Sequence, residues 1–472
     1  MLRHGLSWAL VVAVSAHLAL GASFSWNGSA SNQWGNAANW TLTGGSDADG
    51  VPDADDDVTF PGTGSYAAGV VLGGNRAANS LTYSLTTAFT LGAAGETLTL
   101  TSGTITRQDV SGNEGQHVIA CDLSLPAGTH TWDIAGYETY LTPTAQLLVN
   151  GAITTTGTIV KAGAGKLALG AANSFGSTPQ ILAGVLEVNG VTVASALGAG
   201  DIDFTGVGRL FIRGLDQTVS NDIRVTAGST PQVASYNCTV TLAGDYDIPV
   251  GKTGQLGFSS SSLLIVTGNI TGGGNLEVMR AGAAFHGTGQ FTTGNLFVGR
   301  DGGAVILDGI SWSDFTGHFS NGYGSGAGQW RFGGGGFAAR TTPLLIQASG
   351  VDPGGTNTKT YFDRTVTFGG YWNNTVRLYA DQPVIVDVDT ELTARREWIS
   401  SGNGPGLAGT HDNSKVNEFR GDLTDQVAAG TGASRGALRF TGKFANDEII
   451  LSGTNNWTGS YYNPGLYGDK DS

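Results

Sequence analysis

Short runs of alternating apolar and polar residues recur along the chain, separated by glycine, asparagine, aspartate and serine. Three runs share one pattern, a glycine followed by a leucine and, two positions later, by another large apolar residue: 254–258, 274–278 and 294–298. Residues two apart in a strand point to the same side, so each run directs two apolar side chains toward one face. The small and polar residues between the runs are typical of tight turns. The pattern predicts short β-strands joined by turns, and no long stretch has the period of a helix.

The three runs are offset by twenty residues, which makes Leu256, Leu276 and Leu296 equivalent positions. One strand cannot bury its apolar face alone, but strands at the same position of successive coils can stack and bury theirs together. We therefore predict an all-β fold, an elongated parallel β-helix (β-solenoid) of pectin-lyase-like architecture, in which these leucines stack in register. The same offset carried upstream reaches Tyr236 and Cys238, and it predicts that Cys238 faces the core.

A longer motif extends this pattern. Residues 161–169 read K-A-G-A-G-K-L-A-L, Asn173 and Phe175 follow, and residues 184–188 read G-V-L-E-V. This stretch resembles the autotransporter-associated β-strand repeat, whose pattern is roughly K-x-G-x-G-x-L-x-L, then N-x-aromatic-x-G, then G-x-L-x-V. The resemblance implies a parallel β-helix that is exported to the cell surface or beyond and has a mostly structural or adhesive role. It implies no catalytic residues.

The remaining segments fit the same organisation. The tryptophan-rich segment 22–60 is similar to the opening of large secreted repeat proteins of planctomycete-like and verrucomicrobial bacteria, and we expect it to form an N-terminal cap. Residues 61–330 are expected to form the solenoid, with coils of about 20 residues. Residues 331–472 should continue it and end in an incomplete repeat, because no further G-x-L-x-V strand follows residue 459. We therefore expect a monomer or a fragment of a longer chain.

The first residues have the pattern of a secretory signal peptide. A basic n-region precedes the mostly apolar segment 6–20, and Ala19, Gly21 and Ala22 are small residues near its end. Signal peptidases cleave after such residues, so we predict a signal peptide over 1–21 with cleavage next to Gly21 or Ala22. The apolar run, about 15 residues long, is shorter than the roughly 20 that a membrane-spanning helix needs. The expected location is therefore outside the cytoplasm, secreted or on the outer surface of a bacterial cell.

Composition and charge narrow the set of partners. Only 13% of the residues are charged and the net charge is −14. Nucleic acids and anionic membranes attract proteins that carry a basic surface, so the sequence argues against both as partners. Glycans or other surface components remain as expected partners. The two cysteines, Cys121 and Cys238, leave two interpretations open, a disulfide formed outside the cell or two separate buried thiols.

One carboxylate cluster is a candidate metal site. Calcium loops place oxygen ligands at alternate positions before a glycine and close with an acid six residues later. With Gly50 at the glycine position, Asp47, Asp49 and Asp56 are candidate calcium ligands, although Gly45 stands where the first ligand belongs. The alternative is an acidic, solvated turn. We expect no other cofactor.

Residues suited to catalysis are scarce and scattered. None of the histidines after the signal peptide, among them His117 and His130, has metal-ligand spacing from another, and we expect them in solvated or hydrogen-bonded loops. Asp387, Asp389 and Glu391 alternate as residues on one face of a strand would. Polysaccharide lyases on parallel β-helices use such an acidic row with a nearby arginine, which residues 395–396 could supply.

The sequence as a whole favours a non-enzymatic, structural or adhesive surface protein. Its regular features serve the stacking of coils, and none converges on a reactive centre. A carbohydrate-binding surface protein is the alternative, since Trp372, Trp398 and Trp457 could stack on sugar rings. A polysaccharide lyase that uses the acidic row is the less favoured alternative.

Overall fold

The structure, a computed structural model, describes residues 21–311 with short gaps and separate segments beyond them. The gaps up to residue 311 are 67–68, 110–114, 137–145, 227–229, 258–262, 280–281, 286–293 and 301–303. Beyond it, the described segments are 314–315, 330–332, 336–341, 344–347, 377–380, 384–387, 390–392, 417–420, 423–425, 438–439, 449–453, 455–456 and 461–462. The predicted signal peptide therefore lies outside the described residues except for Gly21, and so do Trp372, Trp398 and Trp457.

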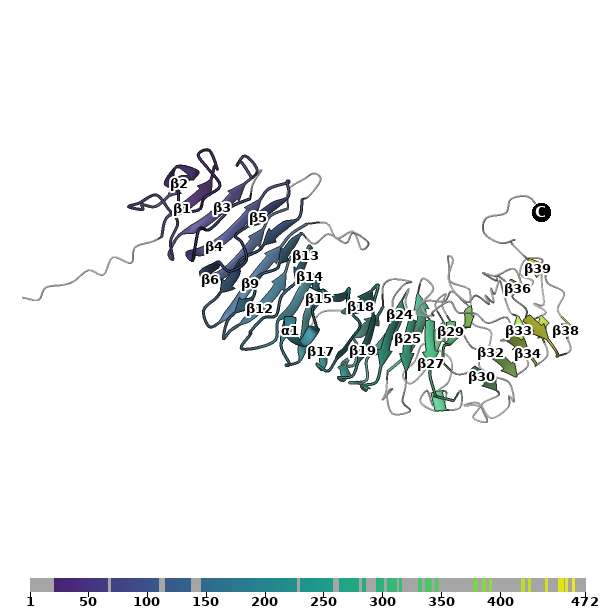
Figure 1. Ribbon diagram of the computed structural model, residues 1–472. Helices are drawn as coiled ribbons and strands as arrows, with labels where there is room; N and C mark the ends of the chain where they lie inside the picture. The colour runs from purple at the N-terminus through teal and green to yellow at the C-terminus, as the bar shows by residue number, and fades with distance from the viewer. Residues whose placement is uncertain are drawn as a thin grey trace, which may run out of the picture.

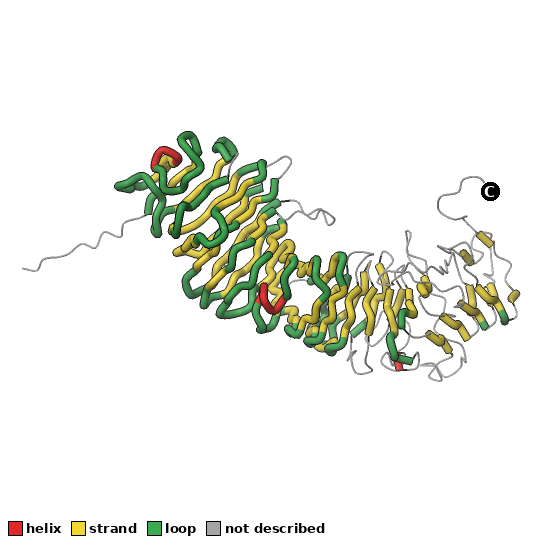
Figure 2. The backbone as a smooth tube through the Cα atoms, in the orientation of Figure 1, coloured by secondary structure: helices red, strands yellow, loops and turns green. Residues whose placement is uncertain are grey.

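The molecule is an elongated β-solenoid whose coils stack one after another along an axis that bends near β17 and β18 (Figure 1). Strands and turns make up nearly all of the described chain (Figure 2). Apart from the antiparallel pair β1 and β2, every pairing between the described strands is parallel, with each strand bonded to its equivalents in neighbouring coils. The predicted all-β parallel β-helix is confirmed.

The strands are short, as the alternating runs predict. The largest sheet contains β1 (Ser23–Trp26), β2 (Trp40–Gly44), β3 (Asp57–Pro61), β4 (Arg76–Ser84), β5 (Phe89–Leu91), β6 (Thr97–Arg107), β7 (His117–Ile119), β8 (Asp122–Ser124), β9 (Thr129–Ile134), β10 (Leu147–Val149), β11 (Ile153–Thr154), β12 (Thr158–Ala162), β13 (Lys166–Leu169), β14 (Gln180–Asn189), β15 (Ile202–Arg213), β17 (Ile223–Val225), β18 (Gln232–Tyr236), β20 (Tyr246–Asp247), β21 (Thr253–Leu256), β23 (Ile270–Thr271), β24 (Asn275–Met279), β26 (Leu296–Arg300) and β28 (Trp330–Phe332).

Four smaller sheets contain the remaining described strands. One contains β16 (Gln217–Val219), β19 (Thr239–Leu242), β22 (Leu263–Val266), β25 (Gly282–Phe285), β27 (Ala304–Leu307), β29 (Gly336–Ala339) and β31 (Arg377–Ala380). The others contain β30 (Leu344–Gln347), β32 (Val384–Asp387), β34 (Asn417–Phe419) and β37 (Ile449–Leu451); β33 (Thr390–Leu392), β35 (Leu423–Asp425) and β38 (Asn455–Asn456); and β36 (Leu438–Arg439) and β39 (Tyr461–Tyr462).

Helical segments are short turns at the corners. The 3₁₀ helix η1 (Ala37–Asn39) precedes β2, and α1 (Val193–Leu197) lies between β14 and β15. Thr192 caps α1 by accepting a hydrogen bond from the Ser195 N–H at 3.2 Å, and the helix ends at Gly198, whose φ is +86°. No helix in the described part of the chain combines the length and apolarity that crossing a bilayer requires.

Tryptophan side chains cover the N-terminal end of the core, where β2 pairs with β1. Trp40 packs edge-to-face on Trp26 and Trp34, with ring centroids 4.9 and 4.8 Å apart. Each buried indole N–H donates to a backbone carbonyl: Trp26 to Ser65, Trp34 to Pro52 and Trp40 to Trp34. The rings therefore bury large apolar faces without leaving a polar group unpaired, which suits them to close the end of a solenoid.

The register of the three leucines differs in part from the prediction. Leu276 of β24 pairs with Leu296 of β26, as the twenty-residue offset requires. Leu256 of β21 pairs with Val278 rather than with Leu276, so the predicted partner is wrong by two positions. A shift of two keeps the same face, and Leu256, Leu276 and Leu296 all lie in the core.

The coil that leads to Leu256 is longer than the coil that follows it, and this changes the residue that pairs with Leu256 upstream. Leu256 pairs upstream with Val233 rather than with Tyr236, so the equivalence drawn to Tyr236 is also wrong. Cys238 nevertheless lies in the core, because the turn before β19 carries it inward. Its Sγ lies 3.4 Å from the carbonyl oxygen of Ile212 in the preceding coil.

Asparagine and aspartate side chains link successive coils at their corners. Asp222 accepts a hydrogen bond from the Asp245 N–H at 2.8 Å, and Asp245 accepts one from the Asn269 N–H at 2.9 Å. Asn173 of the repeat motif accepts from the Ile153 N–H and donates to the Ala196 carbonyl, both at 2.8 Å. These bonds satisfy backbone groups at the turns, where the strand ladder is interrupted.

Glycines of the repeat motif allow tight stacking of neighbouring corners. Gly184 has a φ of +67°, and a Cβ atom there would lie 2.4 Å from the carbonyl oxygen of Gly163 and 2.5 Å from that of Gly165. Gly163 has a φ of +73° and faces the backbone of Ile134 in the same way. Only glycine fits such a position, because the backbone conformation and the neighbouring coil both exclude a side chain.

The motif also contains charged residues that are buried. Lys161 of β12 is fully buried, and its Nζ donates to the carbonyls of Gly163 and Ala183 at 2.9 and 3.1 Å. Glu187 of β14 is fully buried between Lys166 of β13 and Arg213 of β15, with each cation 3.3 Å from one carboxylate oxygen. A buried carboxylate needs such partners, so Glu187 joins three adjacent coils.

Candidate functional site

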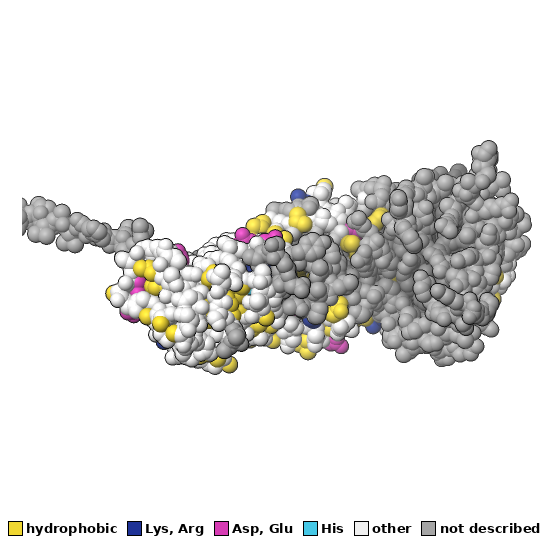
Figure 3. Space-filling view, turned by 90° about the horizontal axis from the view of Figure 1, so that it is seen from above, with side chains coloured by type: hydrophobic (Ala, Val, Ile, Leu, Met, Phe, Trp, Pro, Cys, Tyr) yellow, Lys and Arg dark blue, Asp and Glu magenta, His cyan; other side chains and the backbone are white. Residues whose placement is uncertain are grey.

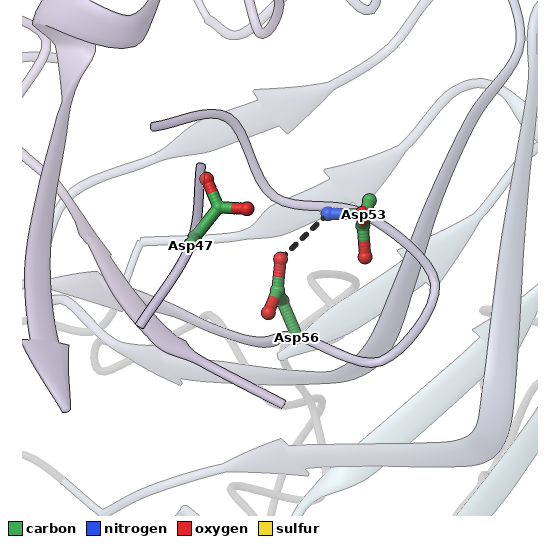
Figure 4. A group of neighbouring side chains, drawn as sticks. All are labelled: Asp47, Asp53 and Asp56. Atoms are coloured by element: carbon green, nitrogen blue, oxygen red, sulfur yellow. Dashed lines mark hydrogen bonds between the residues drawn. The ribbon is translucent and has the colours of Figure 1, made fainter. Parts of the chain in front are cut away.

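The acidic loop between β2 and β3 holds the candidate cation site. The carboxylates of Asp47, Asp53 and Asp56 each contribute an oxygen, and these oxygens all lie within 4.8 Å of one another. Asp56 is buried, whereas Asp53 is exposed and Asp47 is partly exposed. Figure 4 shows the Asp56 carboxylate between the other two residues, with the Asp53 N–H directed at it.

The structure brings together two of the three predicted calcium ligands. Asp47 and Asp56 belong to the group, but Asp49 does not: its Oδ1 accepts from the Val51 N–H at 2.9 Å within a tight turn. Asp53 is the third member of the group. Its N–H donates to Asp56 Oδ2 at 2.9 Å, and this bond brings the two residues close together. A spacing taken from calcium loops therefore missed Asp53, and calcium binding here stays a prediction.

The carboxylates of this loop already accept backbone hydrogen bonds. Asp47 Oδ1 accepts from the Gly50 N–H at 2.6 Å, and Asp56 Oδ1 accepts from the Ala22 N–H at 2.7 Å. Burial raises the pKa of Asp56 above its ordinary value, while the hydrogen bonds from Asp53 and Ala22 act in the opposite direction. The arrangement fixes the loop against β1, and it leaves a concentrated negative charge near residue 22.

The two cysteines are separate thiols. Both are free and buried, so of the two interpretations the disulfide is wrong. Burial raises the pKa of Cys121 to about 12, which keeps this thiol protonated and unreactive at neutral pH.

The acidic row predicted for a lyase is divided between two strands. Asp387 ends β32, whereas Glu391 lies in β33, and these strands belong to different sheets. The expectation that these acids alternate along one strand is therefore wrong, since Asp387 and Glu391 lie in different strands. Asp389 and residues 395–396 lie outside the described residues.

Two histidines are buried in strands, and the expectation of loop positions for them is wrong. His130 of β9 lies with Nε2 2.9 Å from the Pro126 carbonyl and Nδ1 3.2 Å from that of Ser102. His117 of β7 is fully buried beside Tyr83, with ring centroids 5.4 Å apart, and neither of its ring nitrogens has a hydrogen-bond partner of good geometry.

The environment of His117 opposes its protonation. Burial lowers its pKa to about 4, and the nearby positive charge of Arg107 acts in the same direction. The carbonyls of Leu85 and Thr87 favour the charged form, but less strongly. The residue therefore acts as a neutral core side chain, in register with Phe89 of one neighbouring coil and with Leu147 of the other.

We expect His117 to make the fold sensitive to mild acid. Between pH 6.5 and about 4 the unfolded chain binds a proton at this histidine and the folded chain does not, so the free energy of unfolding falls as the pH falls. The loss from this one group reaches about 3 kcal/mol at pH 4. Urea unfolding of the wild-type protein and His117→Leu, compared at pH 8 and pH 4.5, should show a smaller acid loss in the variant. Equal losses would contradict the role given to His117.

No family model matches the chain, and no curated protein or solved structure has a significant match to it. The β-solenoid fold therefore rests on the strand pairing and on the continuous core described above. The motif at residues 161–188 is part of that fold: Leu167 and Leu169 of its first half pair with Leu186 and Val188 of its second half in the next coil.

Proposed function

We propose that this chain is an exported bacterial surface protein with a structural or adhesive, non-enzymatic role, built on repeats of the autotransporter-associated β-strand type. The observation that carries the proposal is that the buried apolar side chains form one continuous core through the coils. A single apolar cluster runs through the stacked coils from Ala22 to Leu344. Such an interior holds an extended surface in place, and each added coil lengthens that surface.

The location proposed for this role has independent support in the sequence. Residues 1–21 have the order of a signal peptide, in which a basic start is followed by an apolar run and small residues. The buried, unreactive thiol of Cys121 tolerates an oxidising compartment without forming a bridge.

The described surface is suited to contact with neutral polar partners. Over the described part of the face seen in Figure 3, uncharged polar side chains and backbone cover most of the area, hydrophobic side chains lie among them, and charged side chains are few. Glycans on a neighbouring cell or matrix are partners of this chemistry, and a sparsely charged surface avoids nonspecific attraction to polyanions. A glycan-binding role is therefore the second candidate.

Export and binding can be tested on the intact gene. We expect cell fractionation to place the protein in the medium or on the outer surface, and small-angle scattering to show a rod. Purified protein should give no unsaturated products or new reducing ends from pectate or alginate, with or without calcium. Saturable signals on a glycan array would favour the glycan-binding candidate. Retention in the cytoplasm would refute export, and turnover of either polysaccharide would refute the non-enzymatic role.

A further inference from the structure

We propose that the bond between Gly21 and Ala22 is the processing site of this chain, and that the Ala22 ammonium group released there forms an ion pair with the buried carboxylate of Asp56. This inference rests on the proposed export of the chain. It adds a specific bond and a specific partner for the new N-terminus, and it gives the acidic loop a role in the mature protein.

The geometry of Ala22 is already that of a bound N-terminus. Its nitrogen lies 2.7 Å from Asp56 Oδ1, and its carbonyl accepts from the Asp57 N–H at 2.9 Å. Ala22 and Asp56 are only 2% and 3% exposed. The residue is thus fixed by its own backbone on the first coil, immediately before β1.

The carboxylates around this nitrogen would be stabilised by a cation. Three carboxylates, those of Asp47, Asp53 and Asp56, gather within 4.8 Å of one another. In the part of the chain that the structure describes, no lysine or arginine forms an ion pair with any of them. A backbone amide contributes only a dipole to this site, whereas an ammonium group contributes a full charge and a stronger hydrogen bond.

Cleavage at either neighbouring peptide bond would agree less well with the structure. Cleavage after Ala22 would remove both the donor to Asp56 and a residue of the core. Cleavage before Gly21 would leave a neutral amide at Ala22. Glycine at 21 and alanine at 19 are the small residues that signal peptidases require before the cut.

The ion pair would make removal of the signal peptide a stabilising step for the cap. Before cleavage, the first strand is joined to a preceding segment and lacks the charge that the acidic loop attracts. After cleavage, the ammonium group ties β1 to the loop that leads into β3. We therefore expect the first coil of the mature chain to open less often than that of a chain extended by one residue.

The first test is the N-terminus of the exported protein. Edman sequencing and intact mass of protein recovered from the medium or cell surface should give a chain that starts at Ala22. An exported chain that starts at another residue would overturn the inference and leave the proposed export standing. An uncut chain in the cytoplasm would overturn both.

The second test measures the ion pair directly. Chains 22–472 and 21–472, released from a removable tag and kept in EDTA, differ by Gly21 alone. The Ala22 nitrogen is an ammonium group in the first chain and an amide in the second, whose ammonium group lies one residue further from Asp56, on Gly21. Hydrogen exchange of the β1 amides should be about tenfold slower in the chain that starts at Ala22, because opening must break the pair. In the Asp56→Asn background this ratio should fall below about twofold, whereas Asp49→Asn should leave it unchanged.

The extension alone changes no side chain that contacts the loop, so the comparison holds even if Asp56→Asn loosens the cap. Equal exchange rates for the two chains with Asp56 present would overturn the ion pair. The same result would follow from a ratio that persists at full size after Asp56→Asn.

Discussion

A Leu276→Asp substitution is expected to prevent stable folding of the central coils. Leu276 is only 3% exposed in the core, where it lies between Gly254 of one neighbouring coil and Leu296 of the other. The substitution removes a buried apolar side chain and places a carboxylate where no cation lies among its paired neighbours. We expect a loss of about 5 kcal/mol or more, because the cavity and the unpaired charge both oppose folding.

Val250→Asp is the matched control for this prediction. Val250 is 81% exposed in a turn, so the same charge there stays in water and should change stability by less than about 0.5 kcal/mol. Soluble yield and thermal unfolding followed by circular dichroism would compare the two variants. A Leu276→Asp protein that melts like Val250→Asp would show that Leu276 does not face the core.

Gly184→Ala is expected to be the second most damaging change. The alanine would have to adopt a φ of +67° and place its Cβ 2.4 Å from the carbonyl oxygen of Gly163. Backbone oxygens of a hydrogen-bonded neighbouring coil cannot move aside freely, so the two coils must separate. We expect a cost of about 3 kcal/mol or more, the sum of the left-handed conformation and the contact.

Gly190→Ala separates these two contributions. Gly190 has a φ of +72°, but a Cβ atom there would meet nothing within 4 Å. The conformational cost alone, about 1 kcal/mol, should therefore appear in this variant. Urea unfolding of both variants gives the comparison, and equal losses would mean that close approach of the coils at Gly184 costs nothing.

The alternating pattern was sufficient to predict the fold, but it could not fix the register. The twenty-residue offset holds from Leu276 to Leu296, whereas the coils on either side of Leu256 are longer, since it pairs with Val278 in one direction and with Val233 in the other. The difference lies in the turns, where residues can be added without changing which side of a strand faces inward. Counting residues therefore placed Leu256 on the correct face and gave it the wrong partner.

The buried polar residues were harder to predict, for different reasons. His117 and Ile119 alternate along β7, so the strand pattern itself could have placed this histidine in the core. Asp53 joins the acidic group through a backbone hydrogen bond to Asp56, which the spacing of calcium loops does not include. Glu187 lies between two cations from neighbouring coils, and only the pairing of β13, β14 and β15 brings these charges together.

The pairing of Leu296 with Trp330 shows how differently the inside and the outside of this protein can evolve. These two residues are neighbours in the sheet, although the chain that joins them is much longer than the chain that joins Leu276 to Leu296. Lengthening a closed loop by that amount costs only about 0.5 kcal/mol in chain entropy. Residues inserted at a corner therefore cost little stability, while the strands on either side must keep the side chains that pack in the core. Each coil can therefore gain new exterior features over generations, and the scaffold that carries them need not change.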